Sequence, residues 1–183
     1  MTSSAAEILS NPQPCGHIVY PYNDETQVAD AVCMFASAGL GKGEAVLLVM
    51  TAEHYGPILE RLAAHGLDVE ALTKSGQLVC EEAGQLLSSF MFDGIIDEYE
   101  FKLKVGNMIK AAQSGGERPV RVFGEMVSLI WQSRQRATER LEELWNDVIA
   151  QHSVPLLCAY ALGGTIPDAF PESLLAQHSH AVS

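Results

Sequence analysis

Side chains able to bind a small molecule follow several of the strands that the sequence predicts. They are Tyr20 and Tyr22, Met50 and Thr51, Glu81 and Glu82, Gly124 to Met126, and Tyr160. In an open parallel sheet, ligands bind beyond the carboxyl ends of the strands, so a site is expected at these positions. Aromatic, sulfur and carboxylate groups without a cation suit a mostly apolar pocket in which a few polar groups orient the ligand.

Glu125 is the carboxylate with the most informative surroundings. A glycine precedes it, which lets the backbone turn sharply, and a helix is expected after it. Glu125 can contact a ligand, or it can only cap that helix, because an acid in the first turn favours the helix dipole. Trp131 has the periodicity of a core residue in this helix and can also cover a pocket.

Sequence motifs for catalysis and phosphate binding are missing. The run Gly39 to Gly43 imitates a phosphate-binding loop, but it follows a predicted helix and precedes a predicted strand, which is the reverse of the required order. No Gly-x-Ser-x-Gly motif occurs, and the four cysteines form no CxxC pair. We therefore expect no enzyme activity.

None of the six histidines has the spacing that places two metal ligands on one helix face. His178 and His180 lie in the polar tail and predict a mobile end or a terminal strand rather than a metal site. We expect neither a metal nor a cofactor.

Composition limits the remaining classes of function. The chain has 183 residues, 48% of them apolar, and a formal net charge of -12. An acidic surface repels a phosphate backbone, so direct nucleic-acid binding is disfavoured. Residues 1–14 lack a secretion signal, and no apolar run approaches the roughly 20 residues of a membrane span. We expect a cytoplasmic protein with no membrane partner and with reduced thiols.

Hydrophobic patterns predict one α/β domain at 15–183, preceded by an extension at 1–14. Strands are predicted at 17–22, 45–50, 77–81, 119–123 and 155–161. Helices are predicted between them, beginning near Asp24 and Ala52, twice within 84–113 with Asp93 capping the second, and as one long helix at 127–150. Alternating strands and helices indicate three layers, with a mainly parallel sheet covered on both faces.

In this order, several segments are similar to one known family: 17–22, 76–78, 121–126, Trp131, 142–146 and 157–160. The combination resembles the MEDS family of sensory domains, named after methanogens, methylotrophs and a dichloromethane-responsive regulator, over about residues 15–182. The resemblance implies a RecA/KaiC-like fold without a working nucleotide site. It also implies a domain found alone or attached to histidine kinases and transcription regulators.

The resemblance also implies which residues carry the function. By position, it selects His17 and Tyr20, Gly124, Glu125 and Met126, and Cys158 and Tyr160; Tyr22 and Trp131 complete the predicted ligand-binding set. Val19 stands where the family often has cysteine, so a thiol or metal role is absent at that position. We expect Tyr20, Tyr22, Glu125, Met126 and Tyr160 to converge on one concavity at the carboxyl end of the sheet.

The leading hypothesis is a non-catalytic input domain of prokaryotic signal transduction or transcription regulation. It would bind a small, hydrocarbon-like ligand and act on a downstream histidine kinase or regulator module, with a homodimer as one expected assembly. One alternative is a constitutive protein-interaction module that uses helix 127–150, and an exposed apolar strip there would favour it. Another is a divergent RecA-like nucleotide-binding enzyme.

Overall fold

A six-stranded, entirely parallel sheet forms the centre of the computed structural model, which describes residues 4–114, 116, 118–164 and 170–182. The strand order is β3-β2-β6-β7-β1-β8. The strands are β1 (His17–Tyr22), β2 (Ala45–Met50), β3 (Leu78–Glu82), β6 (Val120–Gly124), β7 (Leu156–Ala161) and β8 (His180–Ala181). The five longer strands lie within one residue of their predicted bounds, and β8 was not resolved as a strand from the sequence.

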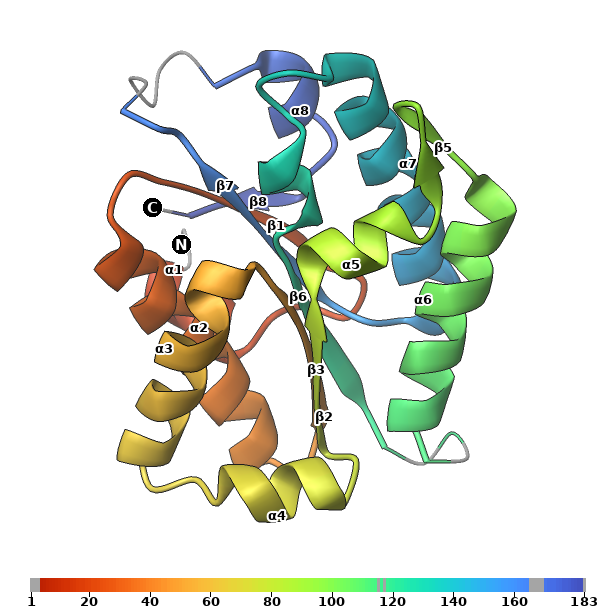
Figure 1. Ribbon diagram of the computed structural model, residues 1–183. Coiled ribbons are helices and arrows are strands. Elements are labelled where there is room, and N and C mark those ends of the chain that lie inside the picture. The colour runs from red at the N-terminus through yellow and green to blue at the C-terminus, as the bar shows by residue number, and fades with distance from the viewer. Residues whose placement is uncertain (1–3, 115, 117, 165–169, 183) are drawn as a thin grey trace.

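Helices cover both faces of this sheet, which confirms the three-layer α/β prediction (Figure 1). One face is packed by α1 (Ala5–Ser10), α2 (Glu25–Gly41) and α3 (Ala52–Ala64). The other is packed by α5 (Ala83–Ser88), α6 (Glu98–Ala112) and α7 (Gln135–His152). Two short helices, α4 (Val69–Lys74) and α8 (Glu172–Leu175), lie in connections. Among the described helices, none combines the length and the apolar character needed to span a membrane.

The segment that joins β1 to β2 follows the sequence expectations. Asp24 caps α2, because its Oδ1 accepts hydrogen bonds from the backbone N–H groups of Thr26 (2.7 Å) and Gln27 (3.3 Å). At the other end, Gly39 to Gly41 form the last turn of α2, and Lys42 is its C-terminal cap. The glycine-rich run is thus a helix-to-strand connection, as predicted, and not a loop between a strand and a helix.

The predicted helix at 127–150 is wrong in its first part. A short 3-10 helix, η1 (Met126–Leu129), is followed by turns before α7 begins at Gln135. Ser128 Oγ accepts a hydrogen bond from the Ala161 N–H (2.8 Å), and Trp131 Nε1 donates to the Ala161 carbonyl (3.0 Å). These bonds fix residues 128–131 to the end of β7. The long helix α7 is a separate element that begins only at Gln135.

The Asp93-Gly94 interruption is the turn of a hairpin rather than the start of a helix. Both residues have positive φ, 51° and 80°, and they join β4 (Met91–Phe92) to β5 (Ile95–Ile96). Asp97 caps α6 instead, accepting from the Glu100 N–H at 3.0 Å.

The inner face of α6 also differs from the prediction. Helical periodicity in the sequence predicts Ile96, Tyr99 and Leu103 on the inner face. Ile96 is buried, but the exposed fractions of Tyr99 and Leu103 are 72% and 42%. Phe101 and Val105 are fully buried in their place. The helix therefore presents a different stripe to the sheet.

The connections of β2 and β6 diverge, although these strands are neighbours. β2 leads through α3 to β3 on one side, whereas β6 leads through α7 to β7 on the other side. In parallel α/β sheets, such a divergence opens a crevice beyond the carboxyl ends of the two strands. The fold thereby marks the edge after Met50 and Gly124 as the place for a site.

Candidate functional site

Glu125 joins the carboxyl ends of β2 and β6. Its fully buried carboxylate accepts hydrogen bonds from the Thr51 N–H (2.7 Å) and the Thr51 hydroxyl (3.1 Å), and its Oε1 lies 2.6 Å from His54 Nδ1. Thr51 is the N-terminal cap residue of α3, so Glu125 serves the start of α3. It makes no side-chain cap bond to η1, which directly follows it. Of the two roles considered for Glu125, the capping of its own helix is therefore not observed.

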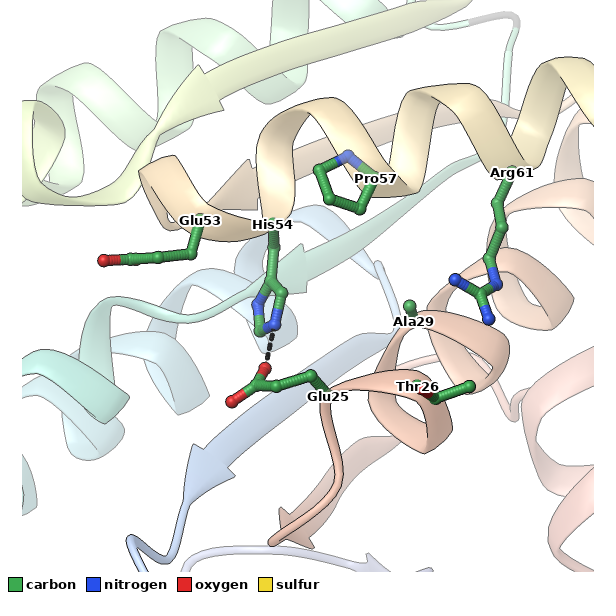
Figure 2. Close-up of a pocket in the computed structure, with 7 residues that line it drawn as sticks. All are labelled: Glu25, Thr26, Ala29, Glu53, His54, Pro57 and Arg61. Carbon is green, nitrogen blue, oxygen red and sulfur yellow. Dashed lines mark hydrogen bonds and ion pairs between the residues drawn. The ribbon is translucent and has the colours of Figure 1, made fainter.

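His54 connects Glu125 to a second carboxylate at the surface. Its Nε2 contacts Glu25, the first residue of α2, whose side chain is 70% exposed (Figure 2). The hydrogen bond to Glu125 raises the pKa of His54 to about 9, outweighing the opposite effect of burial, and Glu25 adds to the increase. At neutral pH this side chain is an imidazolium held between two carboxylates.

A cleft of about 390 Å³ lies beside this histidine, between α2 and α3. Figure 2 shows the lining residues, which are Glu25, Thr26, Ala29, Glu53, His54, Pro57 and Arg61. Ala29 and Pro57 supply apolar surface, and the His54–Glu25 pair supplies a charged one. Arg61 is engaged with Asp30, with Nε and Oδ1 2.8 Å apart. Glu125 does not line the cleft and supports His54 instead.

Tyr20 and Tyr22 lie on the same face of the sheet as this cleft. The Tyr22 ring is centred 5.9 Å from that of His54, and burial, followed by the charges of Glu125 and Glu25, raises the pKa of Tyr22. Both tyrosines line a second pocket, of about 280 Å³, together with Asp24 and neighbouring residues. Tyr22 is thus a neutral phenol near the Glu125–His54 pair.

The other predicted site residues lie on the opposite face. Met126, Trp131 and Tyr160 pack in the core under α6 and α7, and the Trp131 and Tyr160 rings are 6.1 Å apart. Both tryptophans of the chain are buried, as the periodicity predicted. Gly124 is buried within β6.

The expected single concavity is therefore wrong. Tyr160 pairs with Pro21 in the parallel register, and paired positions point to the same face, so Tyr160 points away from Tyr20 and Tyr22. The pocket that Tyr20 and Tyr22 line is not lined by Glu125, Met126 or Tyr160. Ligand contact by any of the predicted residues stays a prediction.

His17 and Cys158 meet in a second buried cluster, on the α7 side. His17 Nε2 lies 3.3 Å from Cys158 Sγ and 3.2 Å from Glu142 Oε2, and His178 completes the group. Tyr160 donates its phenolic hydrogen bond to Glu142. His17, Cys158 and Tyr160, all selected by the resemblance, thus surround the carboxylate of Glu142.

Four residues of these two clusters were not among the predicted site residues: Glu25, His54, Glu142 and His178. Glu142 lies in the segment 142–146 that resembles the family, and His178 was assigned to a mobile end or a terminal strand rather than to a metal site. The signal available for Glu25 and His54 was their position in the first turn of the helix that follows a strand. Their partners lie far away along the chain, so spacing did not reveal them.

Fold and site together define a parallel α/β domain of the RecA type with a cleft at its topological switch point. A KaiC-like protein from the hyperthermophilic archaeon Pyrococcus horikoshii has a similar solved structure. The TM-score is 0.61 at 14% sequence identity, and the match covers 84% of this chain and 66% of that protein. No curated protein matches the sequence.

A family model matches residues 16–179, and its description is the methanogen/methylotroph, DcmR sensory domain, abbreviated MEDS. The chain belongs to this family of sensory domains, which confirms the resemblance. The predicted RecA/KaiC-like fold is confirmed by the archaeal structure.

Proposed function

We propose that this chain is a non-catalytic input domain whose small-molecule ligand binds in the cleft between α2 and α3. The observation that carries the proposal is the position of the His54–Glu25 pair. It stands at the switch point of the sheet, between a solvent-open cleft and the buried carboxylate of Glu125. Family membership supports the sensory role.

The lining indicates the chemical class of the ligand. The cleft volume of about 390 Å³ lies in the lower part of the usual range for small-molecule sites, about 300–1,000 Å³. An apolar body packs against Ala29 and Pro57, and one polar group replaces Glu25 as the partner of His54. This description accommodates short-chain alcohols and halogenated alkanes, whose polar atoms can accept from the imidazolium.

A change at Glu25 can reach the rest of the protein. Glu25 is the first residue of α2, and α2 packs along the sheet through fully buried residues such as Val28, Val32 and Phe35. A ligand that displaces Glu25 from His54 frees the first turn of α2 while Asp24 still caps it. The ligand thereby shifts the population between two positions of this turn, which a downstream histidine kinase or regulator module reads.

The proposed interaction module at 127–150 lacks the feature expected of it. The apolar side chains of α7, including Leu141, Leu144 and Trp145, are buried against the sheet. No exposed apolar strip lies on α7, since every residue of this helix is described. The sensory proposal therefore stands ahead of this alternative.

Amide chemical shifts of the isotope-labelled domain test the proposal. Methanol and dichloromethane are titrated separately, together with Mg-ATP as the probe for the nucleotide-enzyme alternative. We expect one of the small compounds to shift amides of residues 24–29 and 51–61, and Mg-ATP to leave them unchanged.

Two matched variants control for surface effects. Thr26→Phe fills the cleft and is expected to abolish the shifts, whereas Thr73→Phe places the same side chain on the exposed face of α4 and is expected to preserve them. Equal binding by both variants, or shifts confined to other parts of the sheet, would contradict the proposal.

A further inference from the structure

The second buried cluster brings four potential metal ligands to one point. His17 begins β1, Cys158 lies in β7, Glu142 in α7, and His178 follows α8. One ligand atom from each residue lies within 4.8 Å of the other three. His178 Nε2 is 3.4 Å from Glu142 Oε1, and Cys158 Sγ is 3.8 Å from Glu142 Oε2. Four separate segments of the chain thus converge on one small volume.

Hydrogen bonds fix both imidazoles with Nε2 toward the centre. His17 Nδ1 lies 3.1 Å from the Gln177 carbonyl and 2.9 Å from Asn146 Oδ1, and His178 Nδ1 lies 2.7 Å from the Leu174 carbonyl. A carbonyl oxygen only accepts, so in each ring Nδ1 carries the donated hydrogen. In the neutral form, each Nε2 therefore presents a lone pair to the cluster. Metal-binding histidines are oriented by this kind of outer hydrogen bond.

His178 Nε2 has no hydrogen-bond partner, although its side chain is only 1% exposed. A buried polar atom without a partner is unfavourable, so such atoms are rare unless a ligand satisfies them. Its nearest charged neighbour is Glu142, whose oxygen also presents lone pairs. A proton or a metal ion is required between them.

The charge of Glu142 gives the same indication. Its side chain is fully buried, and no lysine or arginine of the described chain pairs with it. An ionised carboxylate at this closed, apolar position is strongly unfavourable unless a cation balances its charge.

We propose that His17, Glu142, Cys158 and His178 bind one divalent transition-metal ion, with zinc as the best fit. Zinc bonds of about 2.0–2.3 Å in a tetrahedron place neighbouring ligand atoms about 3.3–3.6 Å apart. The Nε2–Sγ, Nε2–Oε and Sγ–Oε separations in the cluster, 3.2 to 3.8 Å, lie close to this spacing, with Oε2 of Glu142 facing His17 and Cys158 and Oε1 facing His178. Imidazole, thiolate and carboxylate are all zinc ligands.

Binding releases two protons. A cysteine binds a metal as its thiolate, so the S–H bond of Cys158 breaks, the sulfur forms a bond to the metal, and the thiol proton goes to water. The proton between His178 Nε2 and Glu142 also goes to water, because the metal takes its place. The thiolate and Glu142 carboxylate together balance the two positive charges, so the filled site is neutral. The Tyr160 hydroxyl remains on Glu142 as an outer hydrogen bond.

All four positions of the tetrahedron are supplied by the protein, which is the pattern of a structural rather than a catalytic zinc site. The ion would fasten α7 and the segment after α8 to β1 and β7. Because His178 directly precedes the residues that form β8, the site also holds this edge strand in place. The inference does not depend on what binds in the α2–α3 cleft.

Cobalt binding to the tag-free, chelator-treated protein tests the site. We expect one Co²⁺ per chain, with the thiolate-to-cobalt charge-transfer band and the visible bands of a tetrahedral site. Zn²⁺ should displace the cobalt and raise the unfolding temperature. Failure of the wild-type protein to take up either ion would overturn the proposal, whatever the variants do.

Three variants test whether the cobalt binds at this cluster and not at another cysteine. Cys158→Ser should lose the charge-transfer band, whereas Cys33→Ser, which changes a buried cysteine on the opposite face, should retain it. His178→Gln should weaken cobalt binding by at least tenfold and remove the zinc-dependent increase in unfolding temperature. A Cys158→Ser spectrum equal to that of the wild type would contradict the assignment, and so would unchanged binding by His178→Gln.

Discussion

Two clusters of histidine and glutamate occupy opposite faces of the same sheet, and they differ in access to water. In the first, Glu125 is buried, but the chain of contacts continues through His54 to the exposed Glu25 beside a cleft. In the second, Glu142 is surrounded by His17, His178, Cys158 and Tyr160, all within the core. A similar set of side chains is thus arranged for exchange with solvent on one face and for permanent closure on the other.

The largest expected effect comes from neutralising the closed cluster. Glu142→Gln should lower the free energy of unfolding by about 3–5 kcal/mol, because the histidines and the tyrosine lose their common charged partner in the core. Denaturant titration followed by tryptophan fluorescence measures this loss.

Glu143→Gln on the same helix is the matched control. Its side chain is half exposed and pairs with Arg140, so a loss below about 1 kcal/mol is expected. Equal losses at the two positions would mean that the Glu142 cluster does not contribute as a buried charge network.

The open cluster should respond to pH. The pKa of His54 is raised from 6.5 to about 9 in the folded protein, so the folded state binds more protons between these values. The stabilisation of the folded state by protonated His54 is complete below pH 6.5 and is lost as pH rises through 9. The wild-type free energy of unfolding should therefore fall across this interval by an amount up to about 3 kcal/mol.

His54→Gln is expected to remove most of this pH dependence. The free energy of unfolding is measured at half-unit pH steps for the wild type and for His54→Gln. His65→Gln, which changes an exposed histidine, is the control. A slope that is the same in the wild type and in His54→Gln would assign the titration to another group.

A smaller effect on stability is expected at the contact between Thr51 and Glu125, which joins the carboxyl ends of β2 and β6. Thr51→Val keeps the shape of the side chain but removes the hydroxyl that donates to Glu125, and a loss of about 1.5 kcal/mol is expected for a bond to a charged acceptor. Thr73→Val on the surface of α4 should change stability by less than about 0.5 kcal/mol. Thermal unfolding of both variants at pH 6 is the measurement.

The smallest expected effect is at the outer carboxylate. Glu25→Gln should cost less than about 1 kcal/mol, since the Glu25 side chain is 70% exposed. The same variant should alter the amide shifts that a cleft ligand produces. A large loss of stability would show that Glu25 holds α2 in place and is not free to be displaced.

The fold was largely predictable because its determinants are local. The continuous apolar run of β2 and the Asp24 cap of α2 are each visible in a few consecutive residues. β8 has only two residues, which is too short for a recognisable pattern. The break before α7 depends on hydrogen bonds to Ala161, more than 25 residues later, and periodicity alone gave one continuous helix.

The sites were less predictable because their partners are distant in sequence. His54 and Glu125 are 71 residues apart, and His17 and Cys158 are 141 apart. The strand-end argument identified Glu125 correctly as a residue at the crevice edge, but the face of each tyrosine depends on the register between β1 and β7. A shift of one residue in that register would have reversed the result.

The position of β1 between β7 and β8 also affects how the chain folds. β1 is made before the other five strands of the sheet, whereas both of its neighbours follow much later in the chain; Leu156 in β7 pairs with His17, and His180 in β8 pairs with Ile18. During synthesis this apolar strand has no sheet partner until residues 156–181 have left the ribosome. Long-range parallel pairing of this kind is slow and leaves strand edges open to aggregation. Assistance from a chaperone that shields β1 until the C-terminal residues arrive would therefore raise the yield of folded protein.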